Sequence, residues 1–457
     1  MSLIYAVGTP QVCDLLIEAD AAQRERKALE QKVANGDVAT ETMQALAAAI
    51  LRDTQATAAL HVVQETPAPN PPVPRTHALV IGVGDYPHLR NGTLTLAGQP
   101  AAVSLSLGQL TSPPVSAGAF ADWMVTRFRN DERPLGTVEL LLSPGIYKPG
   151  EAAYGKLGLA PAAEIPVENA TLNNIRAAFS RWLARCNGRH TTALFYFCGH
   201  GVSKGEASLL LPEDFGADPT TPFDRCIDLT ATHRFMGQAL PDAQYFFIDA
   251  CREEPFELLT AQEKPGVTLK GGTAAPFRDR DAPIFAAAAR SKKAHGPDHG
   301  VSYFTQGLIR CLDGVGARKK AGQWRVASPH LHEGLEVMLE RIEQENADKK
   351  LDLSKGVGGE SNMVQPIHFP VSGRVLIDVT CVPDTALPQA DLYILDAQGN
   401  RVSERKHQPT PWLHEIPAGH YRVGADFPTG STFACPPGEL TQIAPPDLDE
   451  PWTLMCQ

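Results

Sequence analysis

Three features are missing from this 457-residue sequence, and each absence excludes a class of protein. No apolar run approaches the length of a membrane helix, so we expect no membrane partner. There is no excess of basic residues: the net charge of -11 argues against nucleic-acid binding. Finally, no pair among the nine cysteines has C-x-x-C spacing, and no Cys/His cluster has zinc-finger spacing. We therefore expect no metal site.

A secretory signal is also missing from the beginning of the chain. There is no basic start, and Gly8-Thr9-Pro10 and Asp14 interrupt any apolar run. A chain of this length needs no disulfides to stabilise it, and reduced thiols are typical of cytosolic proteins. The sequence therefore predicts a cytoplasmic protein.

The composition is typical of a globular protein of more than one domain. Hydrophobic residues make up 43% and charged residues 20% of the sequence. Because 457 residues exceed what one hydrophobic core supports, two or three domains are expected.

The first 62 residues predict a helical N-terminal region. Helical patterns run over 10–33 and 40–58, with an Asn35-Gly36-Asp37 turn signal between them. These helices are either a partner-binding module or an extension packed on the next domain. Residues 63–74 end in a proline-rich run that predicts a stiff linker.

Residues 75–347 alternate between short apolar runs and helical patterns. The expected strands cover 77–83, 138–142, 192–197, 244–248 and 284–288. The expected helices cover 117–129, 172–185, 229–239, 302–312 and 331–345. Strand–helix alternation with continuously apolar strands predicts an α/β domain, a mostly parallel sheet with helices on both faces.

The remaining residues predict a linker and an all-β module. Residues 348–370 are polar and glycine-rich. From 371 to 457 the pattern indicates a small β-sandwich-like domain, with strands at 373–379, 391–395 and 420–425. This domain has no polar cluster that suggests chemistry, so we expect it to bind a substrate or a regulatory protein partner, or to be structural.

Two predicted strands are followed at once by reactive residues. The strand that ends near Phe197 leads into Cys198-Gly-His200-Gly201, and the strand that ends at Ile248 leads into Asp249-Ala-Cys251-Arg252. Ligands bind at the carboxyl ends of the strands in open parallel sheets. His200 and Cys251 are therefore expected at one sheet edge, although 51 residues separate them.

A cysteine and a histidine at one sheet edge fit nucleophilic catalysis. The thiolate attacks, and the imidazole takes its proton and later protonates the leaving group. We expect Cys251 to be the nucleophile and His200 the general base, with the N–H groups of Gly201 and Cys251 as oxyanion donors. Alone, each side chain would be read as structural, but the pairing favours catalysis. This chemistry requires no cofactor.

The two motifs resemble the caspase clan, and in particular the bacterial caspase-like proteins, metacaspases and paracaspases. The resemblance covers residues 75–345. It includes segment 78–86, which is similar to the first core strand, and segments 283–289 and 300–305, which are similar to the small-subunit half. It implies a caspase-like fold, a cysteine endopeptidase and a protein substrate, in a stress, cell-death or phage-defence pathway.

Substrate preference follows from residues that depart from the caspase pattern. Asp249 replaces the Gln of the caspase motif, as in metacaspases and paracaspases, which cleave after Arg or Lys. Those families carry a second acid where this chain has Ser116, and Asp85 is another candidate for the pocket. We therefore expect cleavage after Arg, Lys or a small or neutral residue, but not after Asp. In the alternative reading, Asp249 only hydrogen-bonds loop backbone.

Two further segments differ from a minimal domain of this kind. Residues 87–111 look like an insertion after the first strand. Residues 253–282 predict a mobile loop that controls access to Cys251, through self-cleavage at one of four basic residues: Lys264, Lys270, Arg278 or Arg280.

Two other functions fit the same sequence. One is a non-catalytic interaction protein on a caspase-like scaffold, against which the presence of both His200 and Cys251 argues. The other is an esterase or acyl transferase that uses the same pair.

Overall fold

The structure is a computed structural model of the chain. It describes residues 3–6, 25–26, 28–33, 41–50, 74–98, 107–153, 164–252, 254–255, 258, 266–287, 296–349, 351, 353, 356–446 and 451–457. The chain divides into two compact units. The first comprises Met1–Ser302 and Gly356–Met363, and the second comprises Tyr303–Lys355 and Val364–Gln457.

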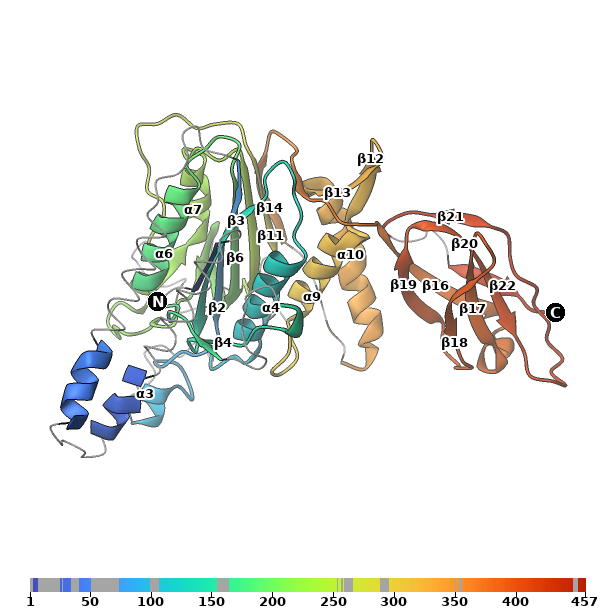
Figure 1. Ribbon diagram of the computed structural model, residues 1–457, viewed down its shortest axis with the longest axis horizontal. Coiled ribbons are helices and arrows are strands. Elements are labelled where there is room, and N and C mark those ends of the chain that lie inside the picture. Colours follow the sequence, from blue (N-terminus) through green and yellow to red (C-terminus); the bar gives the residue numbers. More distant parts are fainter. Residues whose placement is uncertain are drawn as a thin grey trace. The chain divides into compact units, whose positions relative to one another are not determined.

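A seven-stranded sheet forms the centre of the first unit, with the order β1-β3-β2-β6-β10-β11-β14 (Figure 1). Its strands are β1 (Leu3–Ala6), β2 (Thr76–Val83), β3 (Leu135–Ser143), β6 (Thr192–Gly199), β10 (Ala243–Ala250), β11 (Asp281–Ala286) and β14 (Gly356–Ser361). The strands from β3 to β11 are parallel, and both edge strands are antiparallel to their neighbours. The predicted mostly parallel sheet is therefore confirmed.

Helices cover both faces of this sheet, as predicted. Helices α6 (Leu172–Arg185) and α7 (Leu229–Met236) lie on one side and α4 (Ser112–Thr126) on the other (Figure 1). Neighbouring residues of β6 show the alternation: the Phe195 ring contacts Trp182 of α6, whereas the Tyr196 ring stacks on Phe120 of α4 with centroids 4.6 Å apart.

Helix α6 has the boundaries that its sequence predicts, for two local reasons. The side chain of Thr171 caps its N-terminus by accepting a hydrogen bond from the N–H of Asn174 at 3.3 Å. Its apolar residues then recur at helical spacing and are buried: Leu172, Ile175, Ala178, Phe179 and Trp182.

Shorter elements connect the main ones. They are α3 (Thr93–Leu96), β4 (Ile146–Tyr147), β5 (Ile165–Pro166), β7 (Gly201–Lys204), β8 (Ala207–Leu210), η1 (Pro222–Arg225) and β9 (Ile227–Asp228). Strands β7, β8 and β9 form a small antiparallel sheet directly after His200. The sequence did not predict this sheet.

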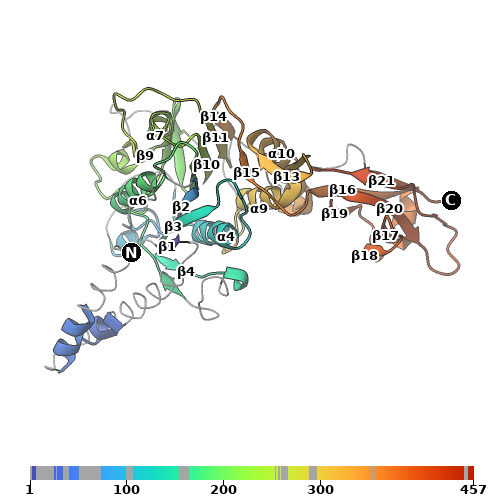
Figure 2. The same cartoon turned by 45° about the horizontal axis from the view of Figure 1, so that its top comes forward.

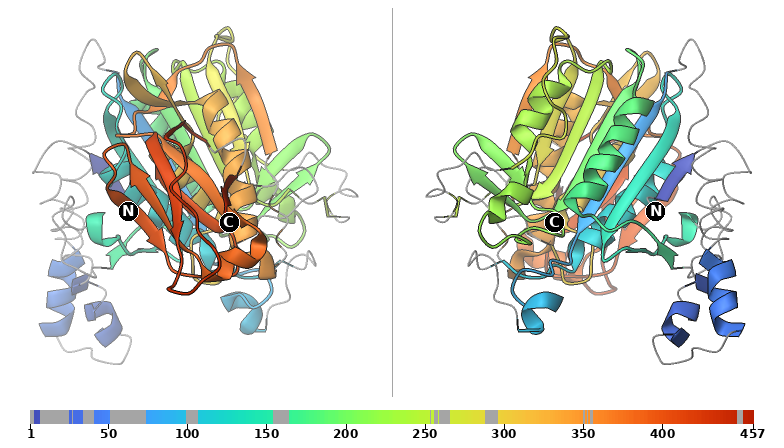
Figure 3. Two further views of the ribbon diagram at one scale, coloured as in Figure 1. Left: turned by 90° about the vertical axis from the view of Figure 1, so that its right-hand side faces the viewer. Right: turned by 90° about the vertical axis from the view of Figure 1, so that its left-hand side faces the viewer.

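The N-terminal region begins with a strand that the sequence did not predict. Residues Leu3–Ala6 form β1, which pairs with β3 at the edge of the sheet (Figure 3). Residues 25–26, 28–33 and 41–50 are helical, within the two predicted helices. The other residues of that region and most of the linker 63–74 lie outside the described residues.

The second unit contains helices, a small sheet and a β-sandwich (Figure 2). The helices are α9 (Tyr303–Arg310), η2 (Cys311–Val315), α10 (Ser328–Glu345), η3 (Ala347–Lys349) and η4 (Asp384–Gln389), and the small sheet comprises β12 (Ala317–Lys320), β13 (Gln323–Ala327) and β15 (Pro366–His368). One layer of the sandwich contains β16 (Arg374–Val382), β19 (Trp412–Pro417) and β22 (Trp452–Met455). The other contains β17 (Asp391–Asp396), β18 (Arg401–Arg405), β20 (Gly419–Asp426) and β21 (Thr441–Ile443). Both layers contribute to one hydrophobic core.

Two strands lie in the segment 348–370 that the sequence predicts as a linker. Strand β14 pairs with β11 along its whole length, and β15 pairs with β13. Each strand therefore completes a sheet of a different unit.

None of the helices in the described parts of the chain has both the length and the apolar character that a membrane span needs.

Candidate active site

The register between β6 and β10 brings the predicted catalytic residues together. These parallel strands pair Asp249 with Cys198 and Ala250 with Gly199. Continuing this register by one residue places Cys251 beside His200, on neighbouring strands that lie about 4.8 Å apart. Residues in register on parallel strands share a face, so both side chains belong to the same side of the sheet edge.

Close packing of Gly201 confirms that the two strand ends approach each other. A Cβ atom at this position would lie 2.6 Å from the carbonyl oxygen of Cys251 and 2.9 Å from the Cβ of Ala250. No side chain fits there without displacing backbone. The glycine after His200 is thus required by the short distance to the cysteine segment.

The hydroxyl of Tyr86 holds the backbone of His200. It accepts a hydrogen bond from the His200 N–H at 2.8 Å and donates one to the carbonyl of Leu211 at 3.2 Å. The Leu211 N–H in turn donates to the His200 carbonyl at 3.0 Å. The Tyr86 hydroxyl therefore takes the place of a direct hydrogen bond from the His200 N–H to the Leu211 carbonyl, in the antiparallel pairing that continues into β7 and β8. It thereby fixes the position of the His200 backbone at the end of β6.

The carbonyl of Gly108 orients the imidazole of His200. Its oxygen lies 2.8 Å from Nε2, and because a carbonyl only accepts, Nε2 carries the proton. In the neutral ring Nδ1 is then unprotonated and can act as a base. Burial lowers the pKa of His200 to about 4, although the hydrogen bond to Gly108 opposes this shift. The ring is therefore neutral at pH 7.

Gln109 anchors the segment that presents this carbonyl. Its Oε1 accepts the Tyr86 N–H at 2.8 Å, and its Nε2 donates to the carbonyls of Tyr86 at 3.0 Å and Arg90 at 3.1 Å. Residues 107–111 belong to the segment that the sequence marks only as an insertion. That segment supplies the histidine's partner, which the sequence analysis missed.

Two of the predicted pocket residues come together through Ser302. The Ser302 hydroxyl donates to the carboxylate of Asp249, and the Ser302 N–H donates to the hydroxyl of Ser116 at 2.9 Å. All three residues are buried on the α4 side of the sheet. Asp249, two residues before Cys251, thus accepts a hydrogen bond from a side chain. The sequence did not single out Ser302, which donates it.

The remaining candidates lie apart from this trio or belong to the core. Asp85 is half-buried after β2, and among the described residues no hydrogen bond or ion pair joins its carboxylate to Asp249 or Ser116. Cys198 is buried, as expected, and burial together with the Asp249 carboxylate raises the pKa of its thiol. Cys251 is partly exposed and is not in a disulfide.

Of the predicted access loop, the structure describes residues 254–255, 258 and 266–282. Backbone hydrogen bonds join Val267 to Cys226 and Arg278 to Gly237. Arg280 is 2% exposed and donates to the His233 carbonyl and to Gln244, so its selection as a self-cleavage site is wrong: a protease needs accessible backbone. Lys270 is half-buried and Arg278 exposed, whereas Lys264 lies outside the described residues.

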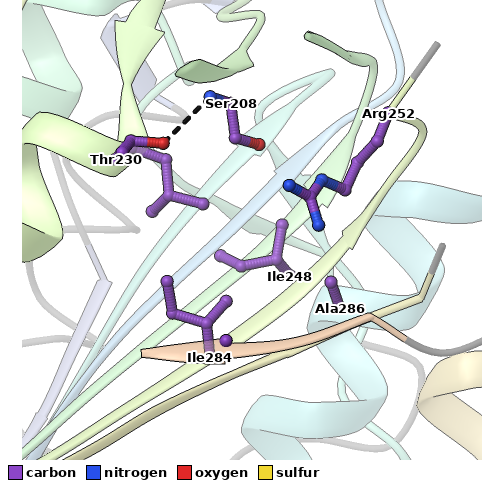
Figure 4. A pocket seen from close by; sticks show the side chains of 8 residues that line it. Ser208, Thr230, Ile248, Arg252, Ile284 and Ala286 are labelled. Atoms are coloured by element: carbon purple, nitrogen blue, oxygen red, sulfur yellow. Dashed lines mark hydrogen bonds between the residues drawn. The ribbon is translucent and has the colours of Figure 1, made fainter. Parts of the chain in front are cut away.

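A small cavity is lined by Arg252, the residue after Cys251, and by Leu229 and Thr230 of α7 (Figure 4). Its volume is about 70 Å³, and Arg252 reaches into it next to Ile248, Ile284 and Ala286. Ligand sites usually enclose several hundred Å³. The cavity is therefore smaller than a typical ligand site, and none of Asp249, Ser116 and Asp85 lines it. No group of three or more His, Cys, Asp or Glu residues in the described parts of the chain is arranged to hold a metal.

The chain is similar to several known proteins. The family model for the caspase domain matches residues 75–345. The uncharacterized protein y4kE of Sinorhizobium fredii is 27% identical over 299 residues, which cover 61% of this chain and 83% of that protein. Among solved structures, caspase-1 of Spodoptera frugiperda is 12% identical with a TM-score of 0.37, covering 66% of this chain and 92% of the other.

The neutral state of His200 sets the acid limit of its use as a base. A pKa of about 4 keeps the imidazole unprotonated down to that pH, whereas an unperturbed histidine loses its basic form below about 6.5. We therefore predict that kcat/KM of any reaction that uses this base is constant down to about pH 5 and falls through about pH 4. An acid limb near 6.5, with the fold intact by circular dichroism, would contradict the buried, neutral histidine.

The role of Gln109 predicts a selective loss of turnover. Gln109→Ala removes three hydrogen bonds and releases the Gly108 carbonyl, so kcat should fall by about 10- to 100-fold with little change in KM. Gln238→Ala is a matched control, because that side chain also bonds loop backbone through Thr273 and Ala275. Both variants should lose stability, but only Gln109→Ala should lose kcat. A wild-type kcat in Gln109→Ala would refute the positioning role.

Proposed function

Because this chain belongs to the caspase domain family, we propose that it is a cysteine endopeptidase with Cys251 as nucleophile and His200 as general base. The observation that supports the proposal is the register of β6 and β10, whose continuation by one residue brings Cys251 next to His200. The Nε2 of this histidine is already bonded to the Gly108 carbonyl. Only Nδ1 of that ring is then available to take a proton.

The first half of the proposed reaction forms an acyl-enzyme. His200 Nδ1 takes the proton of the Cys251 thiol as the sulfur attacks the carbonyl carbon of the scissile bond. The imidazolium then gives this proton to the leaving amine, and the C–N bond breaks. The Nε2–H bond to Gly108 persists throughout and supports the positive charge that the ring carries for part of the cycle.

The second half repeats the proton transfers with water. His200 takes a proton from a water molecule, whose oxygen attacks the thioester carbon, and the ring then returns the proton to the leaving Cys251 sulfur. The carboxylic acid product is released. None of these steps requires a metal or an organic cofactor, because the protein supplies the nucleophile and the base.

Backbone geometry supports Gly201 as an oxyanion donor. The N–H and C=O groups of His200 both point towards the β8 strand, through Tyr86 and Leu211. Successive residues of a strand alternate in direction, so the Gly201 N–H points away from β8. The Cys251 N–H, at the other strand end, is the second proposed donor.

For the substrate, we propose a side chain that is basic, small or neutral before the scissile bond. Asp249 is a buried carboxylate two residues before the nucleophile, and it would pair with Arg or Lys but repel Asp. Its hydrogen bond from Ser302 keeps the carboxylate in place. Asp85 stays a prediction for the same pocket, as do protein partners for the terminal regions.

The catalytic pair should act as one unit. Cys251→Ala, His200→Ala and the double variant should each lower kcat by about 10⁴-fold or more, without additivity. Cys186→Ala and His190→Ala are matched controls, since they remove the same groups away from the site and should retain activity. Turnover of a fluorogenic peptide measures the effect. Substantial peptidase activity in Cys251→Ala would refute the assignment, and ester turnover without peptide cleavage in the wild type would favour an esterase.

Asp249 should determine the preference for a basic residue. Asp249→Asn should lower kcat/KM for Arg and Lys peptides by about 10- to 100-fold, as loss of a hydrogen bond to a charged group does, and leave neutral peptides nearly unchanged. A panel of peptides that differ only at that residue measures this. Preferred cleavage after Asp by the wild type would contradict the pocket, and an unaltered preference in Asp249→Asn would remove Asp249 from it.

A further inference from the structure

Three cysteines meet in the C-terminal sandwich, far along the chain from the proposed nucleophile. Cys381 lies in β16, Cys435 follows β20, and Cys456 follows β22. Electrostatic interactions join Cys456 to both Cys381 and Cys435, and the Cys456 thiol donates a hydrogen bond to the Leu454 carbonyl at 3.6 Å. No step of the proposed reaction uses these residues.

The backbone places Cys435 directly opposite Cys456. The Ala434 N–H donates to the Gln457 carbonyl at 2.7 Å, and the Gln457 N–H donates to the Ala434 carbonyl at 3.0 Å. This reciprocal exchange marks an antiparallel hydrogen-bonded pair, so the adjacent pair, Cys435 and Cys456, is the non-hydrogen-bonded kind with Cα atoms about 4.5 Å apart. That separation lies within the range of about 4.4 to 6.8 Å that a disulfide spans.

The same reasoning excludes a pair of Cys381 with Cys456. In the parallel pairing of β16 with β22, Cys381 lies opposite Leu454, so Cys456 is two residues further along. An interstrand spacing of about 4.8 Å combined with two residues of strand rise gives a Cα separation of about 8 Å. Two cysteines more than about 7 Å apart cannot be joined without backbone movement. Cys381 is therefore not the partner of Cys456, whereas Cys435 lies directly opposite it.

We propose that Cys435 and Cys456 form a reversible disulfide that ties the end of the chain to the loop after β20. Cys435 is partly exposed and Cys456 is 6% exposed, so Cys435 meets a soluble oxidant first. Its thiolate attacks a small-molecule disulfide and releases one thiol. The Cys456 sulfur then attacks the Cys435 sulfur and releases the second thiol, so that one disulfide is reduced as the protein disulfide forms.

Burial of the two thiols makes formation of the disulfide slow, and closure of a ring in the chain favours the product. Burial raises the pKa of both Cys435 and Cys456 to about 11, so both are thiols at neutral pH. The bond would close a covalent ring over residues 435–456, which holds the last strand, β22, on the sandwich. Because ring closure restricts the unfolded chain, oxidation should stabilise this domain.

Disulfide mapping of the full chain tests the proposal. The protein is incubated with oxidised glutathione, its free thiols are alkylated, and its peptides are analysed by mass spectrometry. We expect a Cys435–Cys456 cross-link, reversed by dithiothreitol, and a higher melting temperature of the oxidised protein. Cys381→Ser should retain the cross-link, whereas Cys435→Ser and Cys456→Ser should lose both the cross-link and the shift in melting temperature.

The cross-link and the melting temperature are measured without peptidase activity, so these results do not depend on whether the proposed function is correct. A predominant link of Cys381 to either Cys435 or Cys456 would refute the assignment, as would alkylation of all three thiols after oxidation. A stoichiometric metal bound by the three thiols would also overturn it. Cys186→Ser, which removes a buried cysteine of the first unit, should behave as the wild type and controls for non-specific oxidation.

Discussion

The parallel register of β6 against β10 is the constraint on which the site depends. It carries His200 and Cys251 to the same sheet edge from positions 51 residues apart in the sequence. A shift of one residue would move one side chain to the opposite face. The register is held by apolar contacts on both faces, with Phe195 packed against α6 and Tyr196 against α4. The chemistry therefore depends on the packing of the sheet between its helices.

Contacts beyond the two strands give the histidine its orientation. Tyr86 fixes the backbone where His200 leaves β6, and Gly108 fixes the ring tautomer. Both come from the region after β2, and Gln109 links them by bonding Tyr86 while it presents Gly108. This segment thus determines which ring nitrogen of His200 carries the proton and which is free to accept one.

Strong local patterns made the central sheet predictable, and with it the position of His200 and Cys251 at the ends of neighbouring strands. The parallel strands are apolar throughout and end in polar residues, and α6 carries its own cap and periodicity. Gly108 could not be found in this way, because a backbone carbonyl has no side chain to mark it. Strands β1 and β14 were missed because they are edge strands, whose pairing is decided by tertiary contacts. Ser302 was missed because its role depends on Asp249 and Ser116, which are distant in sequence.

The account is tested most directly by the protonation state of the His200 ring. Long-range ¹H–¹⁵N correlation spectra of the uninhibited protein at pH 7 distinguish the two neutral tautomers and the charged form. The account predicts a neutral ring with the proton on Nε2, donated to Gly108, and Nδ1 bare. A proton on Nδ1, or a charged ring at that pH, would contradict it.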